Sequence, residues 1–352
     1  MLLCRLLLAQ GTEVVVFAMG SDWGSPLVAE LAGLGAQFVM PPPRLWQTPI
    51  LGALYSTLTW PWSIPRTANS LYCIGPGRSH ALLHLLRPRG TKTLYHEIVF
   101  PSAHNTPERQ RAALLDLTIA NSRKVAQIVR RHCPRKPIRV IPFLTSNAPM
   151  PLPARSRPVG TGTLRVTYLG RLVKHKRPDQ LVRRWKALRG APGLDLATLD
   201  VYGYDPTGEM LKELRQLAAE PNLANHVRIH GNYEPESLPA ILAETDLVVL
   251  PSLEEGLPLV LVEAMLQGVP FVATSAGGTE ELGDGNPDVV VTAREWEAFE
   301  AGLVRMAASI RAGQIDALRL HRWAEDRYGY APVSRQWLAC LHQPRKFFGL
   351  YG

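Results

Sequence analysis

Short apolar, β-branched runs alternate with helix-like segments along almost the whole chain, and this alternation constrains the fold more than any other feature. Continuous apolar runs of strand length are buried on both faces, which is typical of parallel sheets covered by helices. The sequence therefore predicts an α/β fold with doubly wound parallel sheets. Runs of this kind lie at 13–19, 93–99, 117–122, 138–143, 164–170, 198–203, 227–231, 246–252 and 269–275, and helical patterns include 178–188 and 208–220.

A polar stretch without periodicity divides the chain. Residues 146–163 are rich in Pro, Ser, Thr and Gly, which is typical of an interdomain linker. A chain of 352 residues also favours about two domains. We expect one Rossmann-like domain at 1–145, a second at 164–330, and a C-terminal helix within 331–352 that packs back on the first. Two such domains would place a ligand cleft at the carboxyl ends of their strands.

Composition and cysteine usage indicate a globular, reduced protein. With 46% hydrophobic and 20% charged residues, the chain can bury a sizeable core. Cys4, Cys73, Cys133 and Cys340 form no C-x-x-C pair, which argues against a disulfide framework or zinc site and favours a cytoplasmic setting. The opening MLLCRLLLAQG resembles a signal h-region but lacks a basic n-region and a cleavage site. We expect a helix there, ending at Gly11.

Positive charge is concentrated in the first half of the chain. Residues 1–150 carry 16 Lys and Arg against 6 Asp and Glu, whereas residues 151–352 carry 23 against 24. The first half is therefore expected to meet an anionic partner, such as phosphate groups, a membrane surface or nucleic acid. No nucleic-acid-binding motif accompanies the charge, so we expect no nucleic acid.

The segment 122–139 holds much of this charge. A basic amphipathic helix can lie on anionic lipid. The alternative is a solvated basic face beside a stripe that faces the core. In 45–62, three tryptophans either anchor at an interface or pack inside the domain. The basic residues are Arg123, Lys124, Arg130, Arg131, Arg135, Lys136 and Arg139, with Val125, Ile128 and Val129 between them, and the tryptophans are Trp46, Trp60 and Trp62.

The stretch YLGRLVKHKRPDQLV combines a strand end with two cations. Gly170 ends the strand, Arg171 and Lys176 lie on the loop, and a helix begins near Pro178. Arginine offers a planar fork and lysine a point charge, and both suit a diphosphate. A solvated basic loop is the alternative interpretation.

Two glycines precede a helix in SAGGTEEL (275–282). Gly277 and Gly278 would let the backbone approach a ligand closely and point free N–H groups at an anion. A plain turn explains the same residues.

Residues 251–265 read PSLEEGLPLVLVEAM, with acid at both ends of an apolar segment. The pattern predicts a buried strand, a loop with Glu255 at the cleft rim, and a helix with Pro258 in its first turn. Leu259 and Val260 then supply free N–H groups at the helix start. Glu263 lies inside the helix among apolar residues, where an unpaired carboxylate is costly without hydrogen-bond donors. A sugar's hydroxyls would supply them.

Several motifs together resemble one family. GRLVKHK, HGNY and DLVVLPSLEEGLPLVLVEAMLQGVPFVATSAGGTEEL, in this order, look like the C-terminal half of the family 4 glycosyltransferases (glycosyl transferases group 1), which have the GT-B fold. The resemblance covers residues 164–290 and includes the Glu-x7-Glu spacing of Glu255 and Glu263. The first half resembles the family more loosely, in LAQGTEVVVFA, TLYHEIVF, LTIANSRKVAQIV and IRVIPF. The resemblance implies two Rossmann-like, doubly wound domains facing a central cleft, with the acceptor side in the first and the nucleotide sugar in the second.

The same resemblance implies a role for individual residues. Arg171 and Lys176 would hold the donor diphosphate and neutralise the leaving group, and Glu255 would contact the donor sugar near the reacting centre. Glu263 would accept hydrogen bonds from the nucleotide ribose. His96 matches a histidine that the family often places facing the donor sugar, and a structural strand-end histidine is the alternative. The other donor-binding residues implied are Gly170, Asn232, Tyr233, Gly256, Leu259, Val260, Gly277 and Gly278, with the nucleobase near Asn232 and Tyr233 and the phosphate near the N–H groups of Leu259 and Val260.

The implied activity is that of a retaining glycosyltransferase of the hexosyltransferase type. It would move a sugar from a nucleotide-diphosphate sugar to a glycan or lipid-linked acceptor. No D-x-D pair is present for a divalent ion, so we expect no metal and no cofactor, with fixed cations and a helix N-terminus stabilising the departing diphosphate. Retention of configuration is implied by the resemblance alone. The expected location is cytoplasmic, with peripheral attachment to the inner face of a membrane.

One departure from the family pattern concerns the start of the chain. Family members normally begin with a strand and a glycine-rich loop that approaches the donor phosphates, whereas MLLCRLLLAQGTEVVVFA matches the following helix and strand. We therefore expect the first domain to lack its first strand, either because the true start lies upstream or because part of the donor site is lost. The alternatives are a non-catalytic GT-B assembly or regulatory subunit, or a nucleotide-sugar epimerase or phosphorylase of the same fold. Pro258, where glycine is common, suits a first helical turn.

Overall fold

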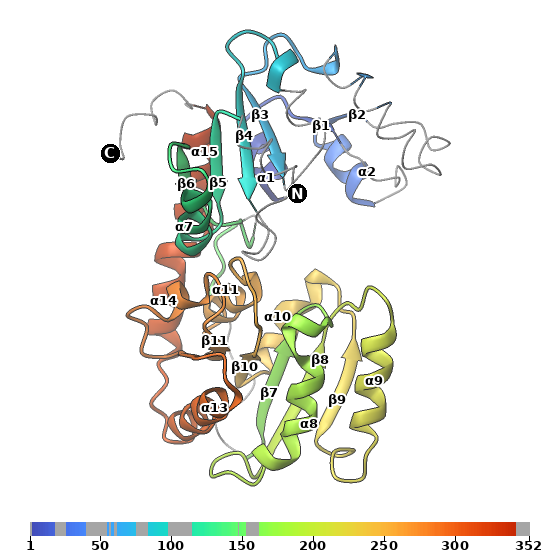
Figure 1. The fold of residues 1–352 in the computed structure, drawn as a ribbon, viewed down its shortest axis with the longest axis vertical. Helices are drawn as coiled ribbons and strands as arrows, with labels where there is room; N and C mark the ends of the chain where they lie inside the picture. Colours follow the sequence, from blue (N-terminus) through green and yellow to red (C-terminus); the bar gives the residue numbers. More distant parts are fainter. Residues whose placement is uncertain are drawn as a thin grey trace. The chain divides into compact units, whose positions relative to one another are not determined.

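The computed structural model shows two compact α/β units. Unit 1 comprises Met1–Ala148 with Tyr330–Gly352, and unit 2 comprises Pro149–Gly329 (Figure 1). The residues whose structure is described are 2–17, 26–39, 55, 58–59, 62–74, 84–97, 115–146, 148–152 and 162–342.

Unit 1 is built on parallel strands. Strands β1 and β2 pair with each other, and a four-stranded sheet has the order β3-β4-β5-β6. The strands are β1 (Val15–Phe17), β2 (Gln37–Val39), β3 (Ser70–Ile74), β4 (Lys92–Glu97), β5 (Leu117–Ala120) and β6 (Ile138–Val140); the described helices of its first 148 residues include α1 (Leu2–Ala9), α2 (Pro26–Gly33) and α7 (Arg123–His132).

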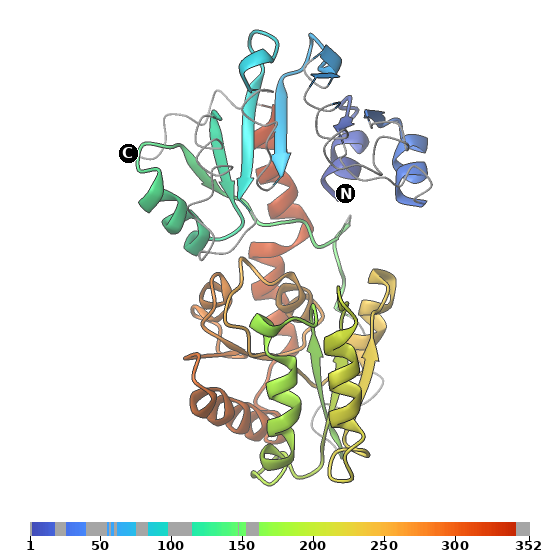
Figure 2. The same ribbon diagram turned by 45° about the vertical axis from the view of Figure 1, so that its right-hand side comes forward.

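The last described helix, α15 (Tyr330–His342), packs in the core of unit 1. The indole of Trp337 is buried, and its Nε1 donates a hydrogen bond to the carbonyl of Pro142 at 2.8 Å. Its ring meets that of Tyr72, on β3, edge to face at 5.4 Å between centroids. Figure 2 shows α15 lying against the strands of this unit. Helix α15 therefore covers a sheet made by the N-terminal half.

Unit 2 is a six-stranded parallel sheet in the order β12-β11-β10-β7-β8-β9. This is a doubly wound order, in which the chain starts in the middle of the sheet, adds strands to one edge and then crosses to the other. The reversal lies between β7 and β10, which pair directly. The strands are β7 (Leu164–Leu169), β8 (Ala197–Tyr202), β9 (Val227–Gly231), β10 (Leu247–Leu250), β11 (Phe271–Thr274) and β12 (Val290–Thr292).

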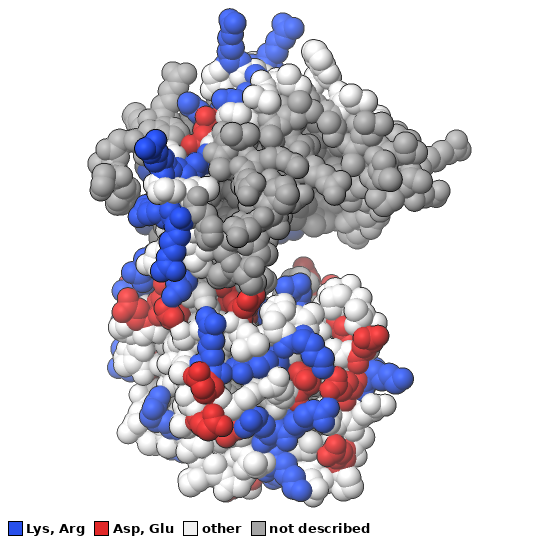
Figure 3. All heavy atoms as spheres, viewed as in Figure 1, with Lys and Arg blue, Asp and Glu red and all other residues white. Residues whose placement is uncertain are grey.

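Helices cover this sheet. Strands β10 and β11 are therefore buried along their whole length. Helix α8 lies on the side of the sheet that faces the viewer in Figure 1 and α9 lies beside β9, with Trp185 of α8 fully buried. On the face of unit 2 drawn in Figure 3, basic and acidic side chains are interspersed. The helices are α8 (Pro178–Leu188), α9 (Glu209–Ala218), α10 (Leu238–Ala243), α11 (Leu259–Leu266), α12 (Thr279–Gly283), α13 (Trp296–Arg311) and α14 (Ala317–Tyr328).

The predicted α/β class with parallel sheets is confirmed, as is a helix before Gly11. Helix α1 ends at Ala9, and Gly11 has a φ of 71° with its N–H bonded to the carbonyl of Leu8. Strands β2, β3 and β12 were not expected. None of the helices within the described residues is long and apolar enough to cross a bilayer.

The apolar stripe of α7 faces the protein core. Val125 and Ile128 are buried, and Val125 packs in a cluster with Ala120 of β5. Arg130 and Arg131 lie on the more exposed side. The helix is therefore a basic surface over a core-facing stripe, and its valines and isoleucine are not available to enter a lipid layer.

Candidate functional site

The loops at the reversal point of the unit 2 sheet bring together most of the residues singled out in the sequence. Gly170 and Arg171 follow β7 directly, and a 3-10 turn at Lys174–Lys176 leads into α8. On the neighbouring strand, the loop after β10 carries Glu255 and leads into α11. Ligands of doubly wound sheets bind at the carboxyl ends of strands at such a reversal. The sheet order thus places two motifs from distant parts of the sequence side by side.

Lys176 and Glu255 form an ion pair at the centre of this site. Lys176 Nζ lies 2.6 Å from Glu255 Oε1, and the two side chains are 12% and 4% exposed. Ser252 Oγ donates a second hydrogen bond to the same oxygen at 2.7 Å. The sequence predicts Glu255 on a loop at the cleft rim, and in the structure the residue is on this loop, buried and partnered. A buried carboxylate held by a lysine and a hydroxyl is a fixed, polar element rather than a mobile surface acid.

The two glycines of SAGGTEEL pack against the loop that carries Glu255. Gly277 has a φ of 59°, and a Cβ at this position would overlap the carbonyl oxygen of Glu255. The N–H of Gly278 donates to the carbonyl of Gly256 at 2.7 Å. The expectation of a free N–H at Gly278 is therefore wrong. These glycines allow one backbone to approach another, and thereby fix the position of Glu255.

Helix α11 points its N-terminus at the same loops. Pro258 is the N-cap residue and Leu259 the first helical residue, so the helix starts one position later than expected. Leu261 is the first residue whose N–H is bonded within the turn, to the Pro258 carbonyl at 3.1 Å. Among the described residues, no acceptor is bonded to the N–H groups of Leu259 and Val260. They form a helix N-terminus of the kind that binds anions.

Glu263 and Tyr233 lie near each other at the other end of the site. Burial raises the pKa of Glu263 to about 7. Burial, followed by the charge of Glu263, raises the pKa of Tyr233 to about 12. Within the described part of the chain, no group donates a hydrogen bond to the Glu263 carboxylate. The carboxylate is thus a poorly solvated acceptor, while Asn232 on the adjacent loop is exposed.

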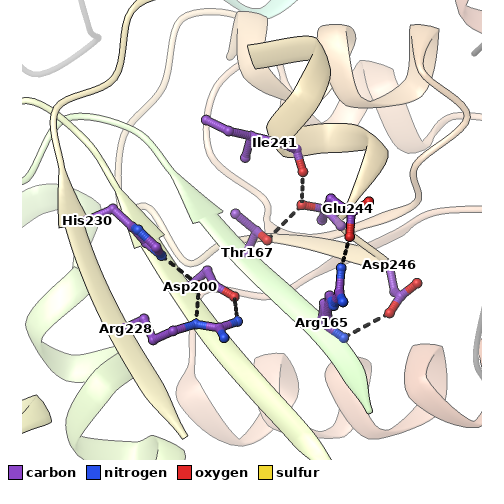
Figure 4. Close-up of polar contacts among 9 residues, drawn as sticks. Arg165, Thr167, Asp200, Arg228, His230, Ile241, Glu244 and Asp246 are labelled. Carbon is purple, nitrogen blue, oxygen red and sulfur yellow. Dashed lines mark hydrogen bonds and ion pairs between the residues drawn. The ribbon is translucent and has the colours of Figure 1, made fainter. Parts of the chain in front are cut away.

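A polar cluster that sequence reasoning missed supports the loop with Asn232 and Tyr233. Asp200, on β8, accepts two hydrogen bonds from Arg228 at 2.7 and 2.6 Å and lies 2.7 Å from Nε2 of His230, both on β9 (Figure 4). Burial opposes ionisation of Asp200, but these hydrogen bonds outweigh it and lower its pKa. The ring of His230 stacks on Tyr202 at 4.1 Å, and Tyr202 meets Tyr233 edge to face. In the sequence, the histidine directly before Gly231 was the one signal that could have indicated this cluster.

A second set of contacts in Figure 4 joins β7 to α10 and to the residue before β10. Arg165, near the start of β7, forms an ion pair with Glu244, and its N–H donates to Asp246 at 2.9 Å. Thr167 and Thr245 share a buried hydrogen bond. These contacts join α10 to the sheet far from the loops of the site, so their role is structural. Among the described residues, no three His, Cys, Asp or Glu side chains lie close enough together to hold a metal ion.

His96 is the one predicted site residue in unit 1. Its backbone lies in β4, paired with Ile74 of β3 and Ile119 of β5. Its side chain is outside the described part of the structure. Its role stays a prediction.

Comparison with known proteins shows which family this site resembles. Residues 163–309 match the model of the family described as glycosyl transferases group 1. This segment is similar to the group 1 glycosyltransferases. The matched segment takes in the whole sheet of unit 2, both loops of the site and α11.

Curated relatives carry the same segment. A D-inositol 3-phosphate glycosyltransferase of Nocardia farcinica is 33% identical over 207 residues, which is 55% of this chain and 46% of that protein. A GDP-mannose-dependent alpha-(1-6)-phosphatidylinositol monomannoside mannosyltransferase of Mycolicibacterium smegmatis is 31% identical over 171 residues, which is 46% of this chain and 44% of that protein. The match therefore spans less than half the length of these relatives.

Solved structures share the fold over nearly the whole chain. Anabaena Alr3699/HepE, solved in complex with UDP and glucose, has a TM-score of 0.73 at 19% identity and covers 97% of this chain and 95% of its own. A glycosyltransferase from Rickettsia africae has a TM-score of 0.74 at 15% identity, with 97% and 93% covered. The expected GT-B fold of two Rossmann-like units is thus confirmed.

Proposed function

We propose that the protein is a retaining, metal-independent glycosyltransferase of the hexosyltransferase type, which moves a sugar from a nucleotide-diphosphate sugar to a glycan or lipid-linked acceptor. The observation that carries this proposal is the buried Lys176–Glu255 pair beside the N-terminus of α11, in a group 1 domain. A lysine and helix N–H groups that converge on one place suit a departing diphosphate. Retention and metal independence rest on the family resemblance and on the absence of a D-x-D pair.

The residues of the site divide between parts of the donor. Lys176, together with the exposed Arg171, would neutralise the diphosphate as the sugar leaves. Glu255 would exchange part of its contact with Lys176 for the sugar hydroxyls. Glu263 would accept hydrogen bonds from the ribose, which supply the donors that this carboxylate lacks.

The relatives support a nucleotide-sugar donor and a polar acceptor bearing phosphate. One matched relative is named for a GDP-mannose donor and a phosphatidylinositol monomannoside acceptor, and another for an inositol phosphate acceptor. The first 150 residues, with their excess of basic side chains, would attract such an anionic acceptor.

Peripheral membrane attachment through α7 would rest on charge alone. The apolar stripe of α7 is buried, so only its solvent-facing arginines, such as Arg130 and Arg131, and the neighbouring Arg135 are available. Adsorption to anionic vesicles should therefore weaken steeply with salt, because exposed charges are screened over about 8 Å at physiological ionic strength. Co-sedimentation with phosphatidylglycerol vesicles at about 50 and about 300 mM salt measures this, and salt-independent binding would contradict it.

Donor binding and turnover test the main proposal. The wild-type protein is first screened with UDP-, GDP- and ADP-sugars for a rise in thermal midpoint, because a ligand that binds only the folded state raises it. Hydrolysis of the stabilising donor is then measured without acceptor. Lys176→Ala and Glu255→Ala should each lower turnover by roughly 10²–10³-fold, the loss typical of removing a charge-stabilising group.

Lys174→Ala is the matched control for Lys176→Ala. Lys174 lies in the same 3-10 turn, is 71% exposed, and pairs with the buried Asp179 and with Glu213. Its variant should turn over donor at the wild-type rate. Full activity in Lys176→Ala and Glu255→Ala would overturn the proposal. Binding without turnover by any acceptor would favour a non-catalytic subunit, and recovery of an epimerised donor would favour an epimerase.

A further inference from the structure

Arg177 adopts a backbone conformation that arginine rarely takes. Its φ is 55° and its ψ 37°, and it is the one non-glycine residue with positive φ in the described part of the chain. It lies between Lys176 and Pro178, where it ends the 3-10 turn and caps α8. Glycine takes this conformation without steric cost, whereas a residue with a side chain must be held there by its surroundings.

The side chain of Arg177 is buried and bonded. The residue is 5% exposed. Its Nε donates to the carbonyl of Pro251 at 2.5 Å, and its Nη2 donates to the carbonyl of Arg294 at 3.0 Å. The guanidinium carbon lies 4.6 Å from the ring centroid of Trp296. One side chain thus connects the loop after β7, the end of β10 and the start of α13.

These contacts reach both members of the ion pair of the site. Lys176 is the residue directly before Arg177. Pro251, whose carbonyl the guanidinium binds, directly precedes Ser252, whose hydroxyl bonds Glu255. A second bond between the two loops, from the N–H of Leu253 to the carbonyl of His175 at 2.7 Å, runs beside it. Arg177 and this backbone bond therefore both join the loop of Lys176 to the loop of Glu255 across the strand reversal.

We propose that Arg177 is a positioning residue for the donor site, which clamps the Lys176 loop to the Glu255 loop through the Pro251 and Arg294 carbonyls. The proposal rests on the proposed glycosyltransferase function and adds a residue that the sequence motifs do not indicate. Burial of a guanidinium and a left-handed backbone are both unfavourable alone. The buried guanidinium and the left-handed backbone persist together only while the carbonyls of Pro251 and Arg294 stay aligned with the guanidinium. The clamp therefore holds the two loops in the arrangement that also forms the ion pair.

Arg177→Gly separates the clamp from the backbone strain. Glycine accepts the left-handed conformation, so this variant loses the guanidinium contacts but relieves the strain and should fold. We expect its kcat for donor hydrolysis to fall about 10- to 100-fold, as for small misplacements of catalytic groups, with KM changed less than about threefold. Arg177→Lys keeps a charge but offers no planar fork, so it should not restore kcat. Added guanidinium ion at low millimolar concentration should partly restore Arg177→Gly.

Arg184→Ala is the matched control, because Arg184 lies over the same Trp296 ring at 4.9 Å and pairs with Glu300 on the surface. It bonds neither Pro251 nor Arg294, and its variant should keep wild-type kcat. A purely structural role of Arg177 would lower the thermal midpoint and the active fraction while leaving kcat per active site unchanged. That result, or wild-type kinetics in Arg177→Gly, would overturn the proposal.

Amide hydrogen exchange tests the clamp without any turnover. Exchange in 171–176 and 252–256 should be faster in Arg177→Gly than in wild type and unchanged in Arg184→Ala. Unaltered exchange in Arg177→Gly would overturn the clamp. Because this measurement needs no substrate, an inactive wild-type protein would count against the glycosyltransferase proposal alone.

Discussion

At the scale of single residues, Gly277 is a point where two loops of the donor site approach closely. Its φ of 59° lies in the left-handed region, and a Cβ there would overlap the Glu255 carbonyl oxygen, so the site has no room for a side chain. Gly277→Ala should therefore combine overpacking with backbone strain and destabilise the fold by roughly 3–5 kcal/mol. Chemical denaturation measures this loss.

Gly285→Ala is the control for Gly277→Ala. Gly285 also has a positive φ, of 70°, but a Cβ there meets nothing within 4 Å. Its variant should lose about 1 kcal/mol, the cost of the backbone conformation alone. Equal losses in both variants would contradict the close approach at Gly277.

Glu263 predicts a pH dependence of stability. Burial raises its pKa in the folded protein from 4.5 to about 7. Between these values the folded protein holds a proton that the unfolded chain releases, so the free energy of unfolding falls as pH rises. Partial exposure moderates the effect, which we expect to be roughly 1–3 kcal/mol between about pH 5 and pH 8.

Glu263→Gln removes this dependence because glutamine does not ionise. Thermal midpoints at about pH 5 and pH 8 should differ less in this variant than in wild type. Glu297→Gln, at an exposed position on α13, is the control and should keep the wild-type difference. A wild-type difference that persists in Glu263→Gln would place the titrating group elsewhere.

At the scale of elements, the sequence predicted where strands lie along the chain better than it predicted which strands pair with each other. The motifs with Lys176 and Glu255 each follow a strand, but the pair is 79 residues apart and forms only because β7 and β10 are adjacent. Alternation of strands and helices does not specify that order, and the family resemblance supplied it. Strands β2 and β12 have three residues each, but so have the predicted β1 and β6, so length alone did not decide which strands were found. Nor does any sequence signal mark the left-handed backbone of Arg177.

The packing of α15 gives a prediction for that helix. Trp337 is 1% exposed, and its indole both bonds Pro142 and contacts Tyr72. Trp337→Ala should lower the free energy of unfolding by about 3–5 kcal/mol, as for other buried tryptophans. Trp337→Phe keeps much of the ring and should lose less. Trp323→Ala, at a more exposed position on α14 in unit 2, should cost less than Trp337→Ala in denaturant titrations.

At the scale of the whole molecule, the excess of positive charge and the donor-site loops belong to different units. The first 150 residues carry the excess of basic residues, whereas the donor-site loops, the ion pair and α11 all lie in unit 2. Each unit also has a separate core, one built around Trp337 and the other around the six-stranded sheet. Nucleotide binding and core mutations should therefore act on different parts of the chain.

Hydrogen exchange resolved by peptide tests this division. A nucleotide at about 100 times its Kd stabilises the state it binds by about 2.7 kcal/mol, so it should slow exchange in β7, β10 and α11 of unit 2. Trp337→Ala should instead speed exchange in β4 and β5 of unit 1, because these strands pack with Trp337 in one core. If nucleotide slowed exchange equally in both units and Trp337→Ala sped it equally in both, the two cores would unfold as one cooperative body. If nucleotide slowed exchange in unit 2 alone and Trp337→Ala sped it in unit 1 alone, the stability of unit 2 would depend on the ligand but not on the core around Trp337. Donor affinity would then be set within unit 2.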